Sequence, residues 1–345
     1  SGDIYSKYMS DLVYTSALPS YVGYNKLSSN LVDMVSHGFE LSLTGYLFPR
    51  KSEFQWDWTL NLANNSTKIA KLGNGGRDYI NRSGYYAFIE GAPAFQYYMY
   101  EYKGTLDYYS DLPVDPFTGE ALKYNGADAG LARNLQGRIF PGMPVFTDVN
   151  GDYRIEGYES ENDMKIIEGK TPEPKVTGGL NTTLRWKALS LRINSSFAFG
   201  HYIVNSTLQQ QLSRFDDAAS FYQYALYKFD DSKFWKAPGD GSYYPMIYVN
   251  YWEGGGARSF RMSSMFIEPG DYWSLDNVTL SYDLPHKWMD KIKMRGINVY
   301  VTGQNLAMWK KSSVLDPRLI SRTGFYNGSG YPISRTIVFG VQLQF

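Results

Sequence analysis

The chain has 345 residues, of which 34 are basic and 34 acidic, and it contains no cysteine. A net charge of zero gives no support for a nucleic-acid partner, and the absence of cysteine excludes disulfides, thiol nucleophiles and cysteine-bound metals. The sequence has no run of about 18 apolar residues, which excludes a transmembrane helix. Aromatic residues make up 17% of the chain and glycine is plentiful, which favours an all-β fold with a preference for membrane interfaces.

Alternation of apolar and polar residues predicts eight strands in chain order. The first is only moderately clear, whereas the next two alternate strictly and gather aromatic residues where they turn at 49–52. A second clean hairpin turns within Trp186-Lys187-Ala188. The predicted strands cover residues 1–14, 37–48, 54–63, 176–187, 189–200, 272–284, 297–303 and 337–345.

The last predicted strand shows the pattern most plainly. Its odd positions are all large and apolar, and they run Ile337, Phe339, Val341, Leu343 and Phe345. A period of two puts them on one face of a strand. About ten residues with one apolar face match a tilted strand that crosses a bilayer, and they also match an edge strand of a soluble sandwich.

The lengths of the connections favour the membrane. Short turns are predicted near residues 50, 187 and 290, and long loops at about 15–35, 65–175, 204–270 and 305–333. Short turns on one side and long loops on the other are typical of an outer-membrane barrel. We therefore predict an antiparallel up-and-down transmembrane β-barrel segment with both chain ends on the short-turn side. Such long loops favour a segment of a larger barrel over a complete barrel of eight strands.

Several short motifs occur in a fixed order along nearly the whole chain. They are His37-Gly38-Phe39-Glu40, Asp148-Val149-Asn150-Gly151-Asp152, Ile267 to Tyr272, Asn277 to Pro285, Gly303-Gln304-Asn305-Leu306, Asp316-Pro317, Tyr331-Pro332 and Arg335-Thr336. In this order and spacing the chain resembles the C-terminal part of the SusC/RagA-type TonB-dependent transporters of the Bacteroidota outer membrane.

The resemblance implies a barrel of about 22 strands with a plugged lumen, of which residues 1–345 would form about the last eight strands. The N-terminal plug and the earlier strands would lie outside this chain. It further implies import of oligosaccharides or oligopeptides across the outer membrane of a Gram-negative bacterium. The implied partners are a SusD-like surface lipoprotein, which would sit on the loops at 65–175 and 204–270, and TonB-ExbB-ExbD, acting through the N-terminal part.

One acidic segment has the spacing of an EF-type calcium loop. Side-chain oxygens of Asp148, Asn150 and Asp152, the backbone carbonyl of Arg154 and the carboxylate of Glu159 occupy positions 1, 3, 5, 7 and 12, where such loops bind a hard cation. Position 6 is Tyr153 instead of the usual glycine. The alternative is a turn held by its own Asp and Asn side chains.

The loops also carry aromatic residues suited to stacking on sugars or contacting peptides. We name Tyr97, Tyr100, Tyr243, Tyr244, Tyr251 and Trp252 as candidates, the alternative being that they pack within the loops. The three histidines lie far apart in sequence and accompany no nucleophile or metal-ligand motif, so we expect no enzyme. The competing function is a surface all-β module whose aromatic, calcium-bearing loops bind glycan.

Overall fold

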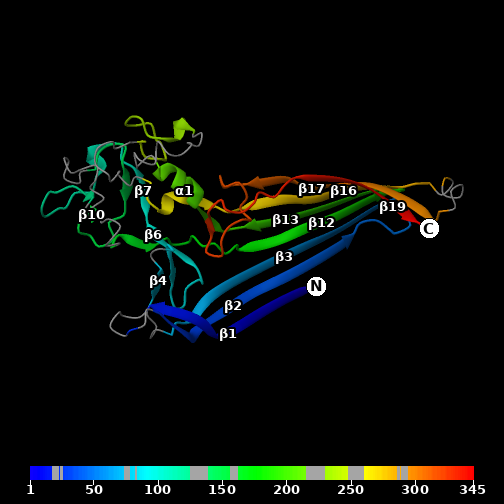
Figure 1. Cartoon of the computed structure of the whole chain (residues 1–345), viewed down its shortest axis with the longest axis horizontal. Helices are drawn as coiled ribbons and strands as arrows, with labels where there is room; N and C mark the ends of the chain where they lie inside the picture. Colours follow the sequence, from blue (N-terminus) through cyan, green and yellow to red (C-terminus); the bar gives the residue numbers. More distant parts are fainter. Residues whose placement is uncertain are drawn as a thin grey trace.

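The computed structural model describes residues 1–17, 23, 26–73, 78–81, 84–124, 139–155, 162–214, 230–247, 260–285, 288 and 294–345. Eight strands form one antiparallel sheet in the order β1-β2-β3-β12-β13-β16-β17-β19 (Figure 1). This up-and-down order confirms the predicted all-β fold and its eight strands. Their bounds are β1 (Gly2–Ala17), β2 (Lys26–Tyr46), β3 (Phe54–Lys71), β12 (Val176–Trp186), β13 (Leu189–Phe199), β16 (Tyr272–Asp283), β17 (Gly296–Lys310) and β19 (Thr336–Gln344).

The first hairpin is longer than its sequence pattern predicted. β1 and β2 stay paired as far as Ala17 and Lys26, so the predicted loop at 15–35 was wrong in its extent. The structure likewise extends β3 to Lys71 and β17 to Lys310. The outer ends of β1, β2 and β3 lack a clean apolar alternation because they extend past β12, where neither face has to be apolar. In β17 the alternation is interrupted after Gln304 by a shift in its register with β16.

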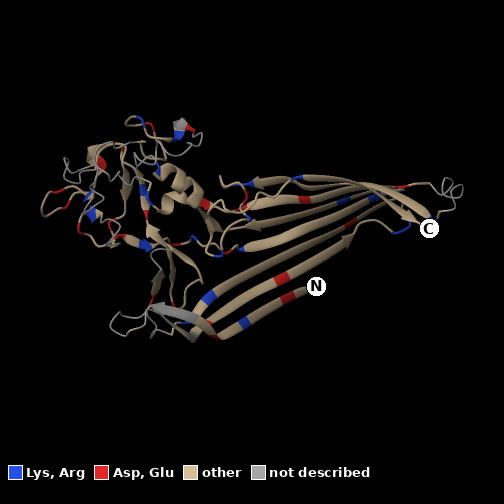
Figure 2. Cartoon of the chain, viewed as in Figure 1, with Lys and Arg blue, Asp and Glu red and all other residues tan. Residues whose placement is uncertain are grey.

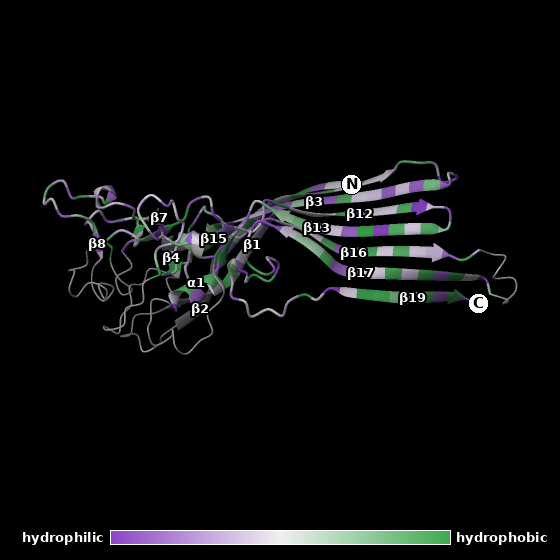
Figure 3. Cartoon of the chain, turned by 90° about the horizontal axis from the view of Figure 1, so that it is seen from above, coloured by the Kyte–Doolittle hydropathy of each residue, from purple (hydrophilic) through white to green (hydrophobic). Residues whose placement is uncertain are grey.

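Apolar side chains form continuous rows across one face of the sheet. One row joins Trp56, Leu184, Leu191, Leu280, Val301 and Phe339 through direct cross-strand pairs. The next row joins Phe54, Trp186, Leu189, Tyr282, Val299 and Val341. Ile4 is 92% exposed and Phe339 80% exposed, so this face has no covering layer within the described part of the chain. We call it the apolar face. Figure 3 shows hydrophobic and hydrophilic residues interspersed along the strands.

The opposite face carries polar rows in the same register. One joins Asp57, Thr183, Arg192, Thr279 and Thr302, and another joins Thr59, Asn181, Asn194, Asn277, Gln304 and Thr336. Hydroxyl groups pair across this face, as between Thr279 and Thr302 at 2.9 Å. We call it the polar face. The two-residue period thus separates an outer from an inner surface.

Aromatic residues border the apolar face at both ends. Phe197, Phe199, Trp273 and Trp309 lie toward the long loops, and Phe197 contacts both Phe199 and Trp273. Phe48, Phe54 and Trp186 lie toward the short turns. The nine steps along the ten residues from Trp273 to Tyr282 cover about 30 Å of strand. A tilt of about 40° reduces this length to about 23 Å, close to the roughly 25 Å apolar band of outer-membrane barrels.

The long connections fold together into a second body at one end of the sheet, which we call the loop domain (Figure 1). Short strands build it: β4 (Tyr79–Asn81), β5 (Tyr86–Phe88), β6 (Gln96–Tyr100), β7 (Tyr102–Thr105), β8 (Lys123–Tyr124), β9 (Pro144–Phe146), β10 (Arg154–Ile155), β11 (Met164–Ile166), β14 (Tyr202–Asn205), β15 (Ile267–Pro269) and β18 (Phe325–Tyr326). Helical segments add α1 (Ser206–Ser213), η2 (Tyr109–Asp111), η4 (Asp231–Lys233) and η5 (Ser264–Phe266). None of the helices in the described ranges is long and apolar enough to cross a membrane.

The largest buried core lies in the loop domain. It includes Tyr97, Met99, Phe146, Ile155, Phe260 and Phe266, contributed by two different long connections. Charged residues are numerous in this domain and sparse along the middle of the strands (Figure 2). The polar loops therefore form a folded body with its own core.

Candidate functional site

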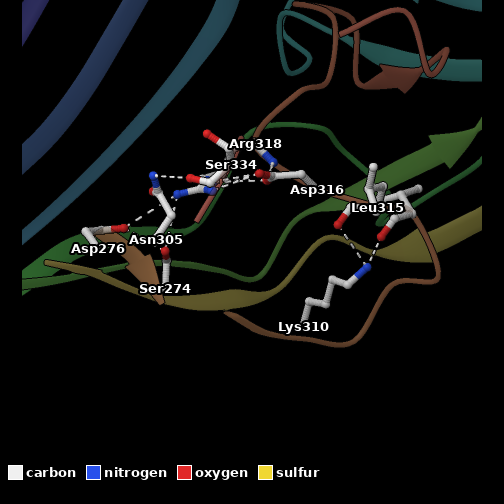
Figure 4. A network of polar contacts seen from close by, with 9 residues as sticks. Ser274, Asp276, Asn305, Lys310, Leu315, Asp316, Arg318 and Ser334 are labelled. Atoms are coloured by element: carbon white, nitrogen blue, oxygen red, sulfur yellow. Dashed lines mark hydrogen bonds and ion pairs between the residues drawn. The ribbon is translucent and has the colours of Figure 1, made fainter. Parts of the chain in front are cut away.

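The candidate site lies where the polar face meets the loop domain. Loop 311–335, which joins β17 to β19, folds back over the ends of β16 and β17 there (Figure 4). A β-bulge between Leu275 and Asn277 inserts Asp276 into the strand, and Asn305 opposite has a positive φ of 51°. A bulge leaves one residue unpaired and re-aims its side chain, so Asp276 is free to bind the loop.

Arg318 is the centre of a polar network at this rim. Its Nε and Nη2 atoms donate to the Asp316 carboxylate at 3.0 and 2.8 Å, and Nη1 donates to Ser274 Oγ at 3.2 Å. Nη1 also lies 3.5 Å from Asp276 Oδ1, which accepts a 2.6 Å hydrogen bond from Ser274. Burial alone would raise the pKa of Asp316, but the hydrogen bonds from Arg318 hold that pKa below its usual range. The Arg318 guanidinium thus has two carboxylates, Asp316 and Asp276, as ion-pair partners.

Two further carboxylates attach the same loop to the barrel rim. Glu268 accepts hydrogen bonds from the Ser313 hydroxyl at 2.7 Å and from Asn205 Nδ2 at 3.1 Å. Asp271 accepts one from Lys311 Nζ at 2.8 Å and one from the Gly200 backbone N–H at 2.7 Å. Both carboxylates therefore join loop 311–335 to the segment that follows β13.

Lys310 and β18 complete the attachment. Lys310 Nζ donates to the carbonyl oxygens of Val314 and Leu315. β18 pairs with β14, and the Val204 N–H donates to the Gly324 carbonyl at 2.9 Å. Loop 311–335 is consequently fixed at both ends, to the rim of the sheet and to the core of the loop domain.

A pocket of about 190 Å³ remains beside this network. Its polar lining comes from Ser274, Asn305, Asp316, Arg318 and Arg335, and its apolar lining from Ala307, Met308, Leu315, Pro332 and Ile333. Asn305 is held by a hydrogen bond from its Nδ2 to the Ser334 carbonyl at 3.2 Å. Polar and apolar groups thus converge where the inner surface opens toward the loop domain.

Two of the predicted ligand-binding aromatic residues are buried. Tyr97 is 1% exposed and donates its hydroxyl to the Tyr202 carbonyl at 2.8 Å, and burial raises its pKa. Tyr100 is 4% exposed, with the Arg261 guanidinium over its ring at 4.8 Å. Packing takes both rings out of reach of solvent, as in the alternative that they pack within the loops, and ligand binding by Tyr97 and Tyr100 stays an untested prediction.

The other predicted aromatic residues differ in position. Tyr243 is 52% exposed and donates its hydroxyl to the Met265 carbonyl at 3.0 Å. The ring of Tyr244 stacks on Phe234 and contacts Tyr243 edge-on. Ligand binding by Tyr243 and Tyr244 stays a prediction. Tyr251 and Trp252 lie outside the residues that the structure describes.

The predicted calcium loop forms a turn held by its own side chains. Asp148 accepts hydrogen bonds from the Gly151 and Tyr153 N–H groups at 2.8 and 2.7 Å. Asp152 Oδ1 accepts one from the Arg154 N–H at 2.8 Å, and Asn150 Oδ1 one from the Asp152 N–H at 3.1 Å. Tyr153 takes a φ of 57°, the left-handed conformation for which a glycine was expected. Glu159 falls outside the described residues, so calcium binding stays a prediction.

Sequence reasoning did not name the rim network as a site. In the sequence, Asp316-Pro317 and Asn305 belong to short motifs, and no motif marks Arg318 or Asp276. Arg318 and Asp276 are 42 residues apart in the chain, so no local pattern relates them. Their contact depends on the path of loop 311–335 across the rim.

Curated proteins similar to the chain are TonB-dependent receptors. The chain is 26% identical to TonB-dependent receptor P3 of Formosa agariphila over all of its length and 32% of that receptor. It is also 26% identical to TonB-dependent receptor P26 of the same organism, over 99% of the chain and 32% of the relative. The chain spans about a third of the length of these curated relatives. No protein-family model matches it.

Solved structures of the RagAB importer are similar to this chain in fold. The RagAB peptide importer in its 'closed-closed' state superposes on the whole chain with a TM-score of 0.71, at 22% identity and over 33% of that importer chain. A second RagAB structure, in the 'open-open' state, gives a TM-score of 0.67 at 21% identity, over the whole of this chain and 32% of that one. In sequence the chain is thus similar to a portion of TonB-dependent receptors, and in fold it is similar to a portion of the RagAB β-barrel.

Proposed function

We propose that the complete protein is a TonB-dependent importer that carries oligosaccharides or oligopeptides across the outer membrane. The observation that carries this proposal is the pairing of an uncovered apolar face with a polar inner face that opens toward a folded loop domain. A lipid bilayer satisfies the first face, and a water-filled or plugged lumen satisfies the second. The loop domain lies where a nutrient would enter.

The partners follow from the same arrangement. A SusD-like surface lipoprotein would cover the loop domain and close over a bound nutrient, and RagAB is a peptide importer with the same barrel fold. TonB-ExbB-ExbD would act through the N-terminal part of the complete protein. In this scheme, nutrient is trapped between lipoprotein and loop domain and is then released inward by movement of the plug. The mechanism needs no bond chemistry from this chain.

The test is growth of the native host on single nutrient classes. A strain that lacks the full-length gene is supplied with either oligopeptides or an oligosaccharide mixture as its only carbon source. Loss of growth on one class, restored by the intact gene but not in a TonB-deficient strain, supports the proposal. Equal growth of deletion and wild-type strains on every nutrient class contradicts it.

Solubility distinguishes the proposed importer from the competing function, a surface glycan-binding module. A membrane barrel with an uncovered apolar face requires detergent to remain dispersed. Purification of the full-length protein as a monodisperse monomer without detergent would favour the glycan-binding module.

A further inference from the structure

Arg335 is the one charged residue lining the rim pocket that has no ion-pair partner within the described residues. The charge of Arg318 is matched by Asp316 and Asp276 at 2.8 and 3.5 Å. Arg335 is exposed and lines the same pocket. No ion pair or hydrogen bond of its side chain occurs within the described ranges, which include every residue of loop 311–335 and of the neighbouring strands. The pocket therefore presents one unmatched guanidinium group.

The position of Arg335 is set by the strand that follows it. Thr336 begins β19 and pairs with Gln304, at the end of the polar row that crosses the inner face. Met308, Leu315, Pro332 and Ile333 supply apolar lining. Asn305 is already held by Ser334, and Asp316 by Arg318. The polar groups around Arg335 thus have partners, and the pocket is ready-made.

The size of the pocket restricts what it holds. A volume of about 190 Å³ is less than the roughly 300–1,000 Å³ of sites that enclose a whole small ligand. It suits one end group of a longer molecule that passes along the inner face. A guanidinium fork matches a carboxylate in shape and charge, and the pair makes two parallel hydrogen bonds.

We propose that the guanidinium group of Arg335 in this pocket binds a carboxylate group of the imported molecule. This inference rests on the proposed import function, and it narrows the nutrient to one that carries a carboxylate. Two sources share this chemistry, the C-terminus of an oligopeptide and the acid group of a uronic-acid oligosaccharide. The apolar walls would contact the methyl and methylene groups, or the sugar ring, next to the carboxylate.

The test measures binding by the full-length receptor in detergent, by calorimetry, with two matched pairs of probes. N-acetyl-trialanine is compared with its C-terminal amide, and trigalacturonate with its methyl ester. We expect one free acid to bind at least about tenfold more tightly than its uncharged analogue, because the analogue cannot make the charge-assisted hydrogen bonds of the carboxylate. The pair that shows the difference identifies the source of the carboxylate.

Arg335→Gln should abolish this difference, and Arg335→Lys should retain part of it, because lysine keeps the charge without the fork. Arg322→Gln is the matched control, since Arg322 is an exposed arginine of the same loop that does not line the pocket. The melting temperature of each variant is recorded alongside.

The outcomes separate the inference from the function on which it rests. If the wild type binds each acid and its uncharged analogue with equal affinity, the carboxylate site is overturned. The same holds if Arg335→Gln keeps the wild-type difference in affinity between acid and analogue. A lower melting temperature in Arg335→Gln with unchanged binding shows that Arg335 acts only in the structure. TonB-dependent growth that persists in either case leaves the import function standing, whereas loss of TonB dependence contradicts import itself.

Discussion

Arg318 binds Asp316 through two nitrogen atoms, Nε at 3.0 Å and Nη2 at 2.8 Å, although the two residues are only two positions apart. The same guanidinium reaches Ser274 on β16 through its third nitrogen. A bidentate, charge-assisted pair is among the stronger polar contacts in proteins. It converts a local turn in loop 311–335 into an attachment between that loop and the barrel rim.

Removal of this attachment should release the loop without unfolding the barrel. Arg318→Gln loses the bidentate pair and leaves the largely buried Asp316 carboxylate without its cation, at a cost of about 2–3 kcal/mol. We expect faster hydrogen exchange in the amides of residues 311–325 and unchanged exchange in β16 and β17. Arg322→Gln serves as the control, and protection of loop 311–325 equal to wild type in Arg318→Gln would show that the attachment does not hold the loop.

Glu101 should make the stability of the loop domain depend on pH. Its carboxylate accepts a 2.7 Å hydrogen bond from Thr147 and lies 3.0 Å from Lys103 Nζ and 3.4 Å from Lys165 Nζ. The Thr147 hydrogen bond, opposed by burial and aided by the two lysines, lowers the pKa of Glu101 to about 2 from the ordinary 4.5. Since the folded-state pKa is the lower one, the contribution is fully present above pH 4.5 and is lost as pH falls toward 2.

The measurement for Glu101 is protease resistance of the loop domain between pH 6 and pH 2. Wild-type protein should lose resistance progressively below pH 4.5. Glu101→Gln, which has no carboxylate to titrate, should start less resistant and change less over the same range. A variant whose pH profile has the same shape as that of the wild type would show that other groups cause the loss.

The two faces of β19 should respond differently to a charge. Phe339 lies on the apolar face opposite Val301, and Val338 lies on the polar face opposite Thr302. A lysine at a lipid-facing site near the middle of a membrane costs about 2–4 kcal/mol. Phe339→Lys in the full-length protein should therefore lower the yield of assembled, heat-modifiable barrel on gels. Val338→Lys is the control at equal depth, and equal losses in both variants would contradict the assignment of the apolar face to lipid.

The Asp148 turn should bind calcium if the predicted loop is completed by Glu159. Oxygen ligands at these spacings suit a hard cation, and we expect calorimetry on the full-length protein to show heat on calcium addition. Asp148→Ala should remove that heat. Because Asp148 also accepts two turn hydrogen bonds, Glu159→Gln provides a second variant that leaves this part of the turn intact. Absence of heat in the wild type removes the calcium site.

The strands could be predicted because the alternation that specifies each of them lies within a few consecutive residues. From Ile337 to Phe345 every second residue is apolar, and a strand in a bilayer must sort its side chains in this way. The same local rule located all eight barrel strands and the short turn at Lys187-Ala188. It failed at the outer parts of β1 and β2, where the strands leave the region in which one face has to be apolar.

The loop domain and the rim pocket depended on tertiary structure. Tyr97 and Tyr100 look like ligand-binding residues in the sequence, yet chain segments more than 100 residues away bury Tyr97 against Tyr202 and Gly324. The sequence by itself determined a sheet of strands with one apolar and one polar face, joined by long loops on one side. It also carried the motifs by which the chain resembles a family. Only the tertiary structure decided which polar residues meet at the rim, because contacts such as that between Arg318 and Asp276 arise from the packing of distant loops and not from any local period.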